Sequence, residues 1–376
     1  MKTYTLVLTV ALSILVIQLA SIEVHVPVST FEYGTLKDRV KERVNYFSSL
    51  IQSTSYSAMQ NVEHDSMIFT GDVMLARNVE VLMDSQGLDY PYQGLVLTAL
   101  AQNPAIVGNF EASMNTAHTP TPAYQMKFSV RVDTLSALAE AGFSHVSLAN
   151  NHSLDYGIDG YKNATARLLE NNIAPFGHGA IINQNSISYI DTPRGIVALV
   201  GINASGNIPT KQDIKNVLTK ADEESDLQII YIHWGIEYDD VHNKTQKLLA
   251  HELVSAGADL IVGHHPHVVQ DIDIVDGVIV FYSLGNYIFD QYFSEEVKEG
   301  LVLSLDMMGE AGVYLLPIES KNPLSQPKQM TPENHALFLQ NLAKRSHPSL
   351  KNSIEKGYIP LGDAVATSSK MAMMVR

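Results

Sequence analysis

From Ser66 onward, short apolar runs alternate with helix-like segments, and this alternation limits the possible folds more than any other feature of the chain. The runs are rich in Ile, Val and Leu, and each leads into a turn containing Gly, Asn or other polar residues, as buried strands do. They cover residues 67–69, 105–107, 145–148, 196–200, 227–232, 260–262 and 278–282. Strands that alternate with helices indicate an α/β fold with largely parallel pairing.

The helix-like segments carry recognisable start and stop signals. Residues 134–141 end at Gly142, and residues 243–256 begin with an Asn cap and stop before Gly257. These are the residue types preferred at helix ends. A third segment covers residues 159–172. Beyond Gly300, residues 301–307 and 313–318 predict an antiparallel pair of strands, and residues 333–345 predict one short helix.

The N-terminus carries an uncharged apolar run at residues 4–21, preceded by Met1-Lys2-Thr3. A spanning helix needs about 17–25 such residues. Cleavage after Ala20 would place Gln18 where signal peptidase requires a small residue. We therefore interpret the run as an uncleaved signal anchor, with a cleaved signal peptide as the alternative. Either interpretation exports the rest of the chain, whereas a buried core helix does not fit so terminal a segment.

Composition excludes several classes of function. The chain has 45% apolar and 17% charged residues, which is typical of a globular protein. It has no cysteine, which rules out disulfides, cysteine-ligated zinc, iron–sulfur clusters, a cysteine nucleophile and a lipoprotein anchor. Its formal net charge of −15 argues against nucleic acid as a partner and against loose docking on an anionic membrane.

Polar side chains follow most of the apolar runs directly. In open α/β sheets, ligands bind beyond the carboxyl ends of the strands, so these side chains predict a shared site. Asp72 follows the run at 67–69 and offers a hard oxygen ligand, although it could instead cap the next helix. Asn109 and Glu111 follow the run at 105–107 and point to the same side of an extended chain, unless they belong to a solvated loop.

The run at 145–148 leads into Asn150-Asn151-His152. The Asn151 oxygen can bind a divalent metal, and His152 can donate a proton to a leaving group. Asp155 could orient His152 through a hydrogen bond. A turn rich in Asn would explain the two asparagines but not the histidine, so we favour a functional role.

Histidines follow two further runs. His233 alone would be interpreted as a buried core histidine, but His264, His265 and His267 follow the run at 260–262. Three histidines in four positions at a strand end indicate a metal site, because imidazole binds Zn, Mn and Fe. A surface cluster without a role is the alternative. Asn286 follows the last run and could contact a ligand or simply adopt a left-handed turn conformation.

The ligand types predict which ion binds. A mixed nitrogen and oxygen set without sulfur favours Mn, Fe or Zn over Ca or Mg. Such ions activate water and neutralise charge on a phosphoryl or acyl oxygen. The sequence contains neither a glycine-rich phosphate loop nor a nucleophile elbow.

Six motifs together resemble the bacterial poly-gamma-glutamate capsule biosynthesis family of CapA type, a branch of the calcineurin-like metallophosphoesterases. The resemblance covers residues 67–306 in the family's order. The motifs are Gly71-Asp72-Val73-Met74-Leu75, Gly108-Asn109-Phe110-Glu111, Ala149-Asn150-Asn151-His152-Ser153-Leu154-Asp155-Tyr156-Gly157, His233-Trp234-Gly235-Ile236-Glu237-Tyr238, Gly263-His264-His265-Pro266-His267 and Tyr282-Ser283-Leu284-Gly285-Asn286.

The resemblance implies a four-layer metallophosphoesterase-like sandwich, in which two mixed sheets are flanked by helices. It also implies a role for each matching residue. His152 and Asp155 would be catalytic, and Asn109, Glu237 and Asn286 would face the substrate. His264 would either face the substrate as well or support the ligands from behind. The implied metal ligands are Asp72, Glu111, Asn151, His233, His265 and His267.

Three positions depart from the family's phosphoesterase pattern. Met74 stands where a histidine is usual, Glu111 replaces a bridging aspartate, and Asn109 replaces a second aspartate. A thioether is a poor ligand for a hard divalent ion. One of the two metal positions is therefore short of ligands, and we expect either a single ion or a weakened second one.

The expected organisation has four parts. Residues 1–22 form the signal anchor or signal peptide, 23–62 a stalk or linker, 63–320 the metallophosphoesterase-like domain, and 321–376 a C-terminal extension. We expect a membrane-anchored component of poly-gamma-glutamate synthesis or export, with a hydrolase-like domain outside the cell membrane. Its partners would be the anionic polymer or a phosphorylated intermediate, and other membrane subunits of a polymer synthase. The alternatives are a secreted metal-dependent phosphoesterase and a non-catalytic metal-binding scaffold.

Overall fold

The computed structural model of the chain describes residues 62–306 and 312–361, all within one compact unit, Gln52–Arg376. The predicted anchor at residues 1–22, and the predicted stalk except for its last residue, lie outside the described residues. Among the residues that are described, no helix is both long enough and apolar enough to cross a membrane.

The larger sheet has nine strands within the described residues, and its central strands run parallel. The order is β14-β13-β12-β1-β2-β3-β4, with β11 paired to β1 and β15 to β13. Strands β1 to β4 are parallel neighbours, whereas β12 pairs antiparallel with β1. The bounds are β1 Ser66–Val73, β2 Pro104–Phe110, β3 Phe143–Ser147, β4 Ala174–Phe176, β11 Asn286–Ile288, β12 Glu299–Asp306, β13 Gly312–Lys321, β14 Leu324–Gln329 and β15 Tyr358–Pro360.

The smaller sheet has six strands in the order β5-β6-β7-β8-β10-β9, counted over the described ranges. Strands β6, β7, β8 and β10 are parallel neighbours, and an antiparallel strand closes each edge. The bounds are β5 Ile187–Thr192, β6 Gly195–Asn203, β7 Leu227–His233, β8 Leu260–His264, β9 Ile272–Val275 and β10 Val278–Phe281. Both sheets are therefore mixed.

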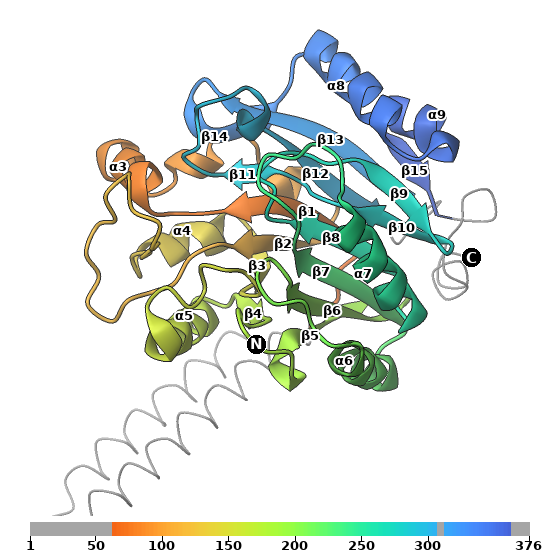
Figure 1. Ribbon diagram of the computed structural model, residues 1–376. Helices are drawn as coiled ribbons and strands as arrows, with labels where there is room; N and C mark the ends of the chain where they lie inside the picture. Colours follow the sequence, from red (N-terminus) through yellow and green to blue (C-terminus); the bar gives the residue numbers. More distant parts are fainter. Residues whose placement is uncertain (1–61, 307–311, 362–376) are drawn as a thin grey trace, which may run out of the picture. The chain divides into compact units, whose positions relative to one another are not determined.

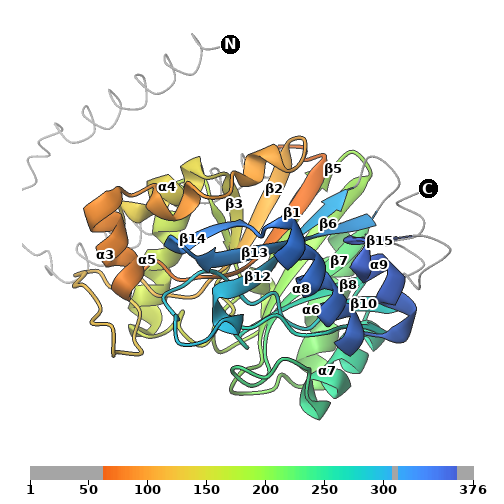
Figure 2. The same ribbon diagram turned by 90° about the horizontal axis from the view of Figure 1, so that it is seen from above.

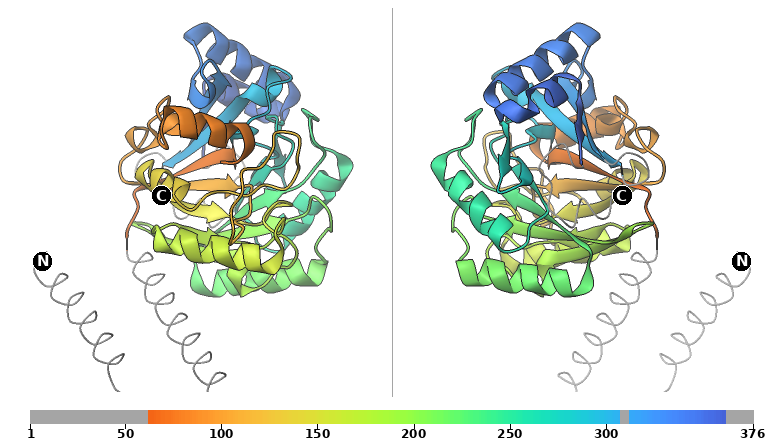
Figure 3. Two further views of the ribbon diagram at one scale, coloured as in Figure 1. Left: turned by 90° about the vertical axis from the view of Figure 1, so that its left-hand side faces the viewer. Right: turned by 90° about the vertical axis from the view of Figure 1, so that its right-hand side faces the viewer.

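Most of the helices cover the outer faces of the two sheets, whereas the two nearest the C-terminus add side chains to the apolar cluster between the sheets (Figures 1 and 2). Their bounds are α3 Arg77–Gln86, α4 Thr134–Glu140, α5 Gly157–Glu170, α6 Lys211–Glu224, α7 Lys244–Ser255, α8 Pro332–Arg345 and α9 Lys351–Glu355. Short 3-10 helices cover Tyr90–Tyr92, Leu97–Ala99, Gln184–Ser186, Glu296–Lys298 and Pro348–Leu350. Figure 3 shows α8 and α9, in blue, together at one end of the sheets.

Three buried clusters explain this layering. In β1, Met67 and Phe69 pack between the sheets with residues of β7 and β8. Ile68, on the other face of the same strand, packs with residues of α3, α4 and α5. A third cluster joins the smaller sheet to α6 and α7. Because the central strands are buried on both faces, they are apolar without alternation, and this makes them visible in the sequence.

The strand and helix predictions agree with the structure at most positions. Each of the seven apolar runs overlaps a strand, and the predicted antiparallel pair is β12 with β13. The expected parallel pairing holds from β1 through β4 and among β6, β7, β8 and β10. Pairing is antiparallel among β1, β12, β13 and β14 and at both edges of the smaller sheet. The predicted boundary between residues 320 and 321 falls inside β13. The residues after it continue the larger sheet through β14 and β15, with α8 and α9 between those two strands.

Candidate metal centre

The carboxyl ends of β1, β2, β3, β7 and β8 meet along one edge, which we call the rim. The register brings Asp72 opposite Asn109 on β2 and opposite Asn286 on β11. In the other sheet, His233 lies opposite His264. The larger sheet therefore delivers Asp72, Asn109 and Asn286 to the rim, and the smaller sheet delivers His233 and His264.

Glycines let the backbones approach closely beneath the rim. A Cβ atom on Gly71 would lie 2.0 Å from the carbonyl oxygen of Gly285, and one on Gly263 would lie 2.1 Å from that of Tyr282. Both contacts are with backbone, which cannot move aside easily. The Asp72 amide also donates a hydrogen bond to the Gly285 carbonyl at 3.0 Å. The sequence needs glycine at these positions to hold Asp72 and His264 in place.

Asp72 is a buried carboxylate surrounded by donors. Its Oδ1 accepts a hydrogen bond from Asn109 Nδ2 at 2.8 Å, and its Oδ2 lies 3.2 Å from Nδ1 of His267. Burial alone would raise the pKa of Asp72, but His264 and His267 hold that pKa well below its ordinary value. Asp72 is therefore ionised at neutral pH.

Glu111 carries the clearest sign of a cation site. Its Oε1 is buried without a hydrogen-bond partner among the described residues. Three imidazole Nε2 atoms face this oxygen, at 3.7 Å for His267, 3.9 Å for His152 and 4.0 Å for His233. These separations are too long for hydrogen bonds. Two ligands that each lie about 2.1 Å from a shared ion are about 3–3.5 Å apart, so a small contraction would enclose one.

Electrostatics at Glu111 support the same interpretation. Burial raises the pKa of this carboxyl well above its usual range, and the nearby Asp72 and Glu237 carboxylates raise it further, against the opposing effect of His267. A buried carboxylate without a partner is costly. A cation beside Oε1 would remove this cost, so the donor set fits a divalent ion.

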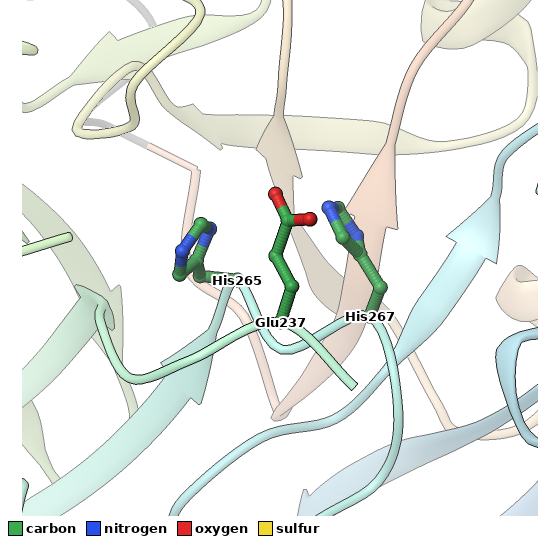
Figure 4. Close-up of side chains that lie close together, drawn as sticks. All are labelled: Glu237, His265 and His267. Carbon is green, nitrogen blue, oxygen red and sulfur yellow. The ribbon is translucent and has the colours of Figure 1, made fainter. Parts of the chain in front are cut away.

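Ligand atoms gather in two adjacent groups. Asp72, Glu111 and His233 form one, and Glu237, His265 and His267 form the other; within each group the ligand atoms lie within 4.8 Å of one another. Figure 4 shows the Glu237 carboxylate between the imidazoles of His265 and His267. The contact of His267 with both Asp72 and Glu111 joins the two groups.

The histidine loop after β8 is held in an unusual conformation. His265 and His267 have φ angles of 98° and 59°, a region that costs energy for residues other than glycine. Burial and the neighbouring His267 lower the pKa of His265 to about 4. Burial opposes protonation of His267 as well, but Glu111, Asp72 and Asn286 raise its pKa to about 9. The two imidazoles are thus in different protonation states at neutral pH.

His152 is fixed from several sides. Its Nδ1 lies 2.9 Å from Asp155 Oδ2, which also accepts a hydrogen bond from the Phe128 amide at 2.7 Å. The Phe128 ring stacks on the imidazole at 4.0 Å. Its neighbour Asn151 is exposed but places Oδ1 2.8 Å from His233 Nε2. The structure brings these residues to the rim, and the catalytic role assigned to His152 and Asp155 stays a prediction.

The four residues expected to face the substrate divide into two kinds. Glu237 is partly exposed, whereas Asn109, His264 and Asn286 are buried. Asn109 donates to Asp72, Asn286 lies 3.0 Å from His267 Nδ1, and the His264 Nδ1 lies 3.4 Å from Asp72. These three side chains contact predicted ligand residues beneath the surface, and their contact with a substrate stays a prediction.

Two supporting residues were missed in the sequence. Asn150 donates to the Asn109 side chain at 3.1 Å and to the Phe110 carbonyl at 2.9 Å, and it accepts from the His152 amide at 3.1 Å. Its place beside Asn151 and His152 was the available signal, but no role was predicted for it individually. Phe128 lies in the long connection between β2 and α4, where the sequence gives no indication of a contact with His152.

Comparison with known proteins connects this geometry to a family. The model of a family described as bacterial capsule synthesis protein PGA_cap matches residues 66–291, which include every candidate site residue. The chain is 28% identical over 299 residues to the PGA biosynthesis protein CapA of Bacillus subtilis, covering 75% of this chain and 78% of that one. It is 30% identical over 297 residues to the capsule biosynthesis protein CapA of Bacillus anthracis, covering 73% and 72%.

A solved structure also matches, at a greater distance. A hypothetical protein from Thermus thermophilus has a TM-score of 0.40 and 14% identity, covering 70% of this chain and 95% of that one. A likeness this distant carries no argument about fold or function.

Proposed function

Because this chain belongs to the bacterial capsule synthesis protein PGA_cap family, we propose that it takes part in the biosynthesis or export of poly-gamma-glutamate, as a capsule or a secreted polymer. We further propose that it does so through a metal-dependent, phosphoesterase-like site at the rim. The observation that carries this proposal is the buried Oε1 of Glu111, which has no hydrogen-bond partner within the described residues and faces three imidazole nitrogens.

In this proposal, some residues of the rim bind the ion and another donates the proton. Six would hold the ion: Asp72, Glu111, Asn151, His233, His265 and His267. A bound divalent ion would supply a Lewis acid that polarises a phosphoryl or acyl oxygen. His152 would deliver a proton to the leaving group, because Asp155 and Phe128 fix its ring beside Glu111.

The number of ions is one or two, drawn from Mn, Zn or Fe. Glu237 affects this number, because it forms a second group of three ligand atoms with His265 and His267. Oxygen and imidazole ligands without sulfur suit these three metals. The order of helices, sheet, sheet and helices, with the site at the ends of strands from both sheets, supports our proposal of a metallophosphoesterase-like sandwich.

The cellular setting follows from the N-terminal sequence and the charge. We propose that residues 4–21 anchor the chain in the cell membrane with the rim outside, or direct its secretion. The substrate would be the anionic polymer or a phosphorylated intermediate, and other membrane subunits of a polymer synthase would be partners. A chain with a net charge of −15 needs a local cation to hold a polyanion, and the proposed ion meets that need.

Metal analysis of the purified chain tests the proposal most directly. We expect the wild type to carry one or two equivalents of Mn, Zn or Fe, and His265→Ala to carry fewer. A wild-type chain that neither retains nor binds any divalent ion would overturn the metal-dependent site. Polymer formation by cells that carry Asp72→Ala or His265→Ala then tests whether the site is needed. Normal polymer formation in both variants would favour a non-catalytic scaffold.

A second candidate function is a plain secreted phosphoesterase. The contacts of His152 with Asp155 and Phe128 favour this function. They fix the imidazole beside the candidate metal site, and a fixed imidazole is suited to general acid catalysis. This function predicts phosphate release from a simple phosphate ester that depends on Mn or Zn. The release should fall about 100-fold or more in His152→Ala. Unchanged release in that variant would rule out His152 as the proton donor.

A further inference from the structure

A buried arginine lies behind the candidate metal centre. Arg77 begins α3, has a φ of 54° and is 8% exposed. Its Nη2 pairs with Oδ1 of Asp290, which follows β11, and Oδ2 of Asp290 accepts a hydrogen bond from the Asn78 amide at 3.1 Å. The ion pair therefore joins the segment after β1 to the segment after β11. Both strands carry residues of the rim.

The guanidinium of Arg77 lies over two phenylalanine rings. Its Cζ is 4.6 Å from the centroid of Phe128 and 5.8 Å from that of Phe289. The two rings, which we call the phenylalanine pair, meet edge to face at 6.2 Å. A guanidinium over aromatic faces is attracted by the ring quadrupole and more strongly so when it is buried. Arg77 thus fixes both rings together.

The phenylalanine pair in turn contacts two histidines of the rim. Phe128 stacks on His152 at 4.0 Å with an interplanar angle of 26°, and Phe289 lies 4.7 Å from His267. The Phe128 ring therefore contacts both the imidazole of His152 and the guanidinium of Arg77. The Phe128 amide also donates to Asp155, which holds Nδ1 of His152.

Direct binding of substrate by Arg77 fits these contacts less well. One guanidinium nitrogen is engaged by Asp290, and the Nη1 contact is with the thioether of Met126 at 3.8 Å. The Nε atom has no partner among the described residues, but it is buried away from solvent. A neutralised and covered cation is poorly placed to meet an anion from outside. The remaining contacts of the guanidinium are with the rings of Phe128 and Phe289.

We propose that Arg77 is a positioning residue, which sets the ring orientations of His152 and His267 through Phe128 and Phe289. The proposal rests on the proposed function, since it assigns His152 and His267 their roles at the metal centre. Residues that orient metal ligands from behind typically change metal affinity by about 10–100-fold when they are removed.

Three variants of the 376-residue chain separate the possible effects. Arg77→Lys keeps a positive charge beside Asp290 but removes the planar group over the rings. Arg77→Met combined with Asp290→Asn removes the ion pair without leaving a buried charge unpaired. The matched control is Arg131→Met. Arg131 also joins α3 to the segment before α4, through Asp84 and Asp133, but that ion pair is more exposed.

Two measurements decide the question. The first is NMR of the histidine rings in metal-free protein labelled with ¹⁵N-histidine. The second is the dissociation constant for Mn²⁺ by calorimetry. We expect both Arg77 variants to shift the ring signals of His152 and His267 and to weaken Mn²⁺ binding about tenfold. The control should change neither, and circular dichroism should show that all chains remain folded.

The outcomes separate this proposal from the metal site itself. Unshifted His152 and His267 signals in both folded Arg77 variants would overturn the positioning role, whatever the metal result. If the wild type binds no Mn²⁺, Zn²⁺ or Fe²⁺, the proposed function fails, yet the ring signals still decide whether Arg77 positions the histidines. If one Arg77 variant does not fold, the other supplies the test.

Discussion

At the scale of single residues, the pair formed by Glu111 and His267 governs how the site responds to pH. Their facing atoms are 3.7 Å apart. Burial raises the pKa of Glu111 well above its ordinary value, and the neighbouring carboxylates raise that of His267 to about 9 despite its burial. The metal-free pair therefore retains a proton at neutral pH. A divalent ion must displace it, because imidazole and carboxylate ligands bind in their deprotonated forms.

We therefore predict that affinity for Mn²⁺ rises as the pH is raised from about 6.5 to about 9. The stability of the metal-free protein should change in the opposite direction and fall over the same pH range. The pKa of His267 is higher in the folded chain than its ordinary value, so its contribution is full below about pH 6.5 and is lost as the pH rises through about 9. Calorimetry in buffers of different ionisation enthalpy should detect proton release on binding. His267→Gln should flatten the dependence, and a pH-independent affinity in the wild type would contradict the prediction.

Asn109 offers a second test at this scale, because its amide donates to the buried carboxylate of Asp72 beside the proposed ion. Asn109→Asp replaces the donor 2.8 Å from Asp72 with a like charge. We predict a lower thermal midpoint without metal, by several degrees, because two adjacent carboxylates repel. With Mn²⁺ present, the added ligand should increase affinity. Thermal unfolding with and without Mn²⁺ measures both effects, and a variant destabilised equally in both conditions would argue against an ion beside Asp72.

The sequence predicted the residue types at the rim and the contact between Asp155 and His152, but not the other contacts. His265 and His267 stood out because three histidines follow one strand, and Asp72 because it follows another. The support from Phe128 and Arg77 could not be predicted, since Arg77 meets Asp290 across 213 positions of the chain. The burial of Asn286 behind His267 is likewise a consequence of packing, which local sequence does not encode.

At the scale of secondary-structure elements, burial on both faces explains which strands could be predicted. Central strands such as β7 and β8 are continuous apolar runs. The short strands β4 and β11 were missed. Each has only three residues, which is too few to show the hydrophobic periodicity of a strand. Helix α6 was missed although Ile214, Val217, Leu218 and Ala221 follow the helical spacing and Thr210 caps it.

Helix α7 provides a prediction for an element, because it leads directly into β8 and the histidine loop. Asn243 Oδ1 accepts from the Gln246 amide at 3.0 Å, and Gln246 Oε1 accepts from the Asn243 amide at 2.9 Å. Asn243→Ala removes one half of this capping box and should lower the free energy of unfolding by about 1 kcal/mol. Urea unfolding measures the change. Asn216→Ala, at an exposed position within α6, is the control and should cost little.

At the scale of the whole molecule, the candidate metal centre joins two sheets that otherwise meet through apolar side chains. One sheet and the loops after its strands supply Asp72, Glu111 and Asn151, whereas the other supplies His233 and, after β8, His265 and His267. Neither sheet alone offers a complete ligand set. An ion would therefore replace repulsion among buried polar groups at the rim with bonds that cross between the sheets.

This arrangement predicts that the ion stabilises the described domain as a whole. Mn²⁺ at about 100 times its dissociation constant should raise the free energy of unfolding by about 2.7 kcal/mol, because it binds the folded chain alone. For a chain of this size the thermal midpoint should rise by roughly 5 °C, and a chelator should reverse the rise. His265→Ala removes a proposed ligand from the loop after β8. The thermal midpoint of this variant should therefore respond much less to the same Mn²⁺ concentration. An equal rise in wild type and variant would mean that the ion binds elsewhere on this acidic chain, and the two sheets would then be held together by their apolar core without help from the rim.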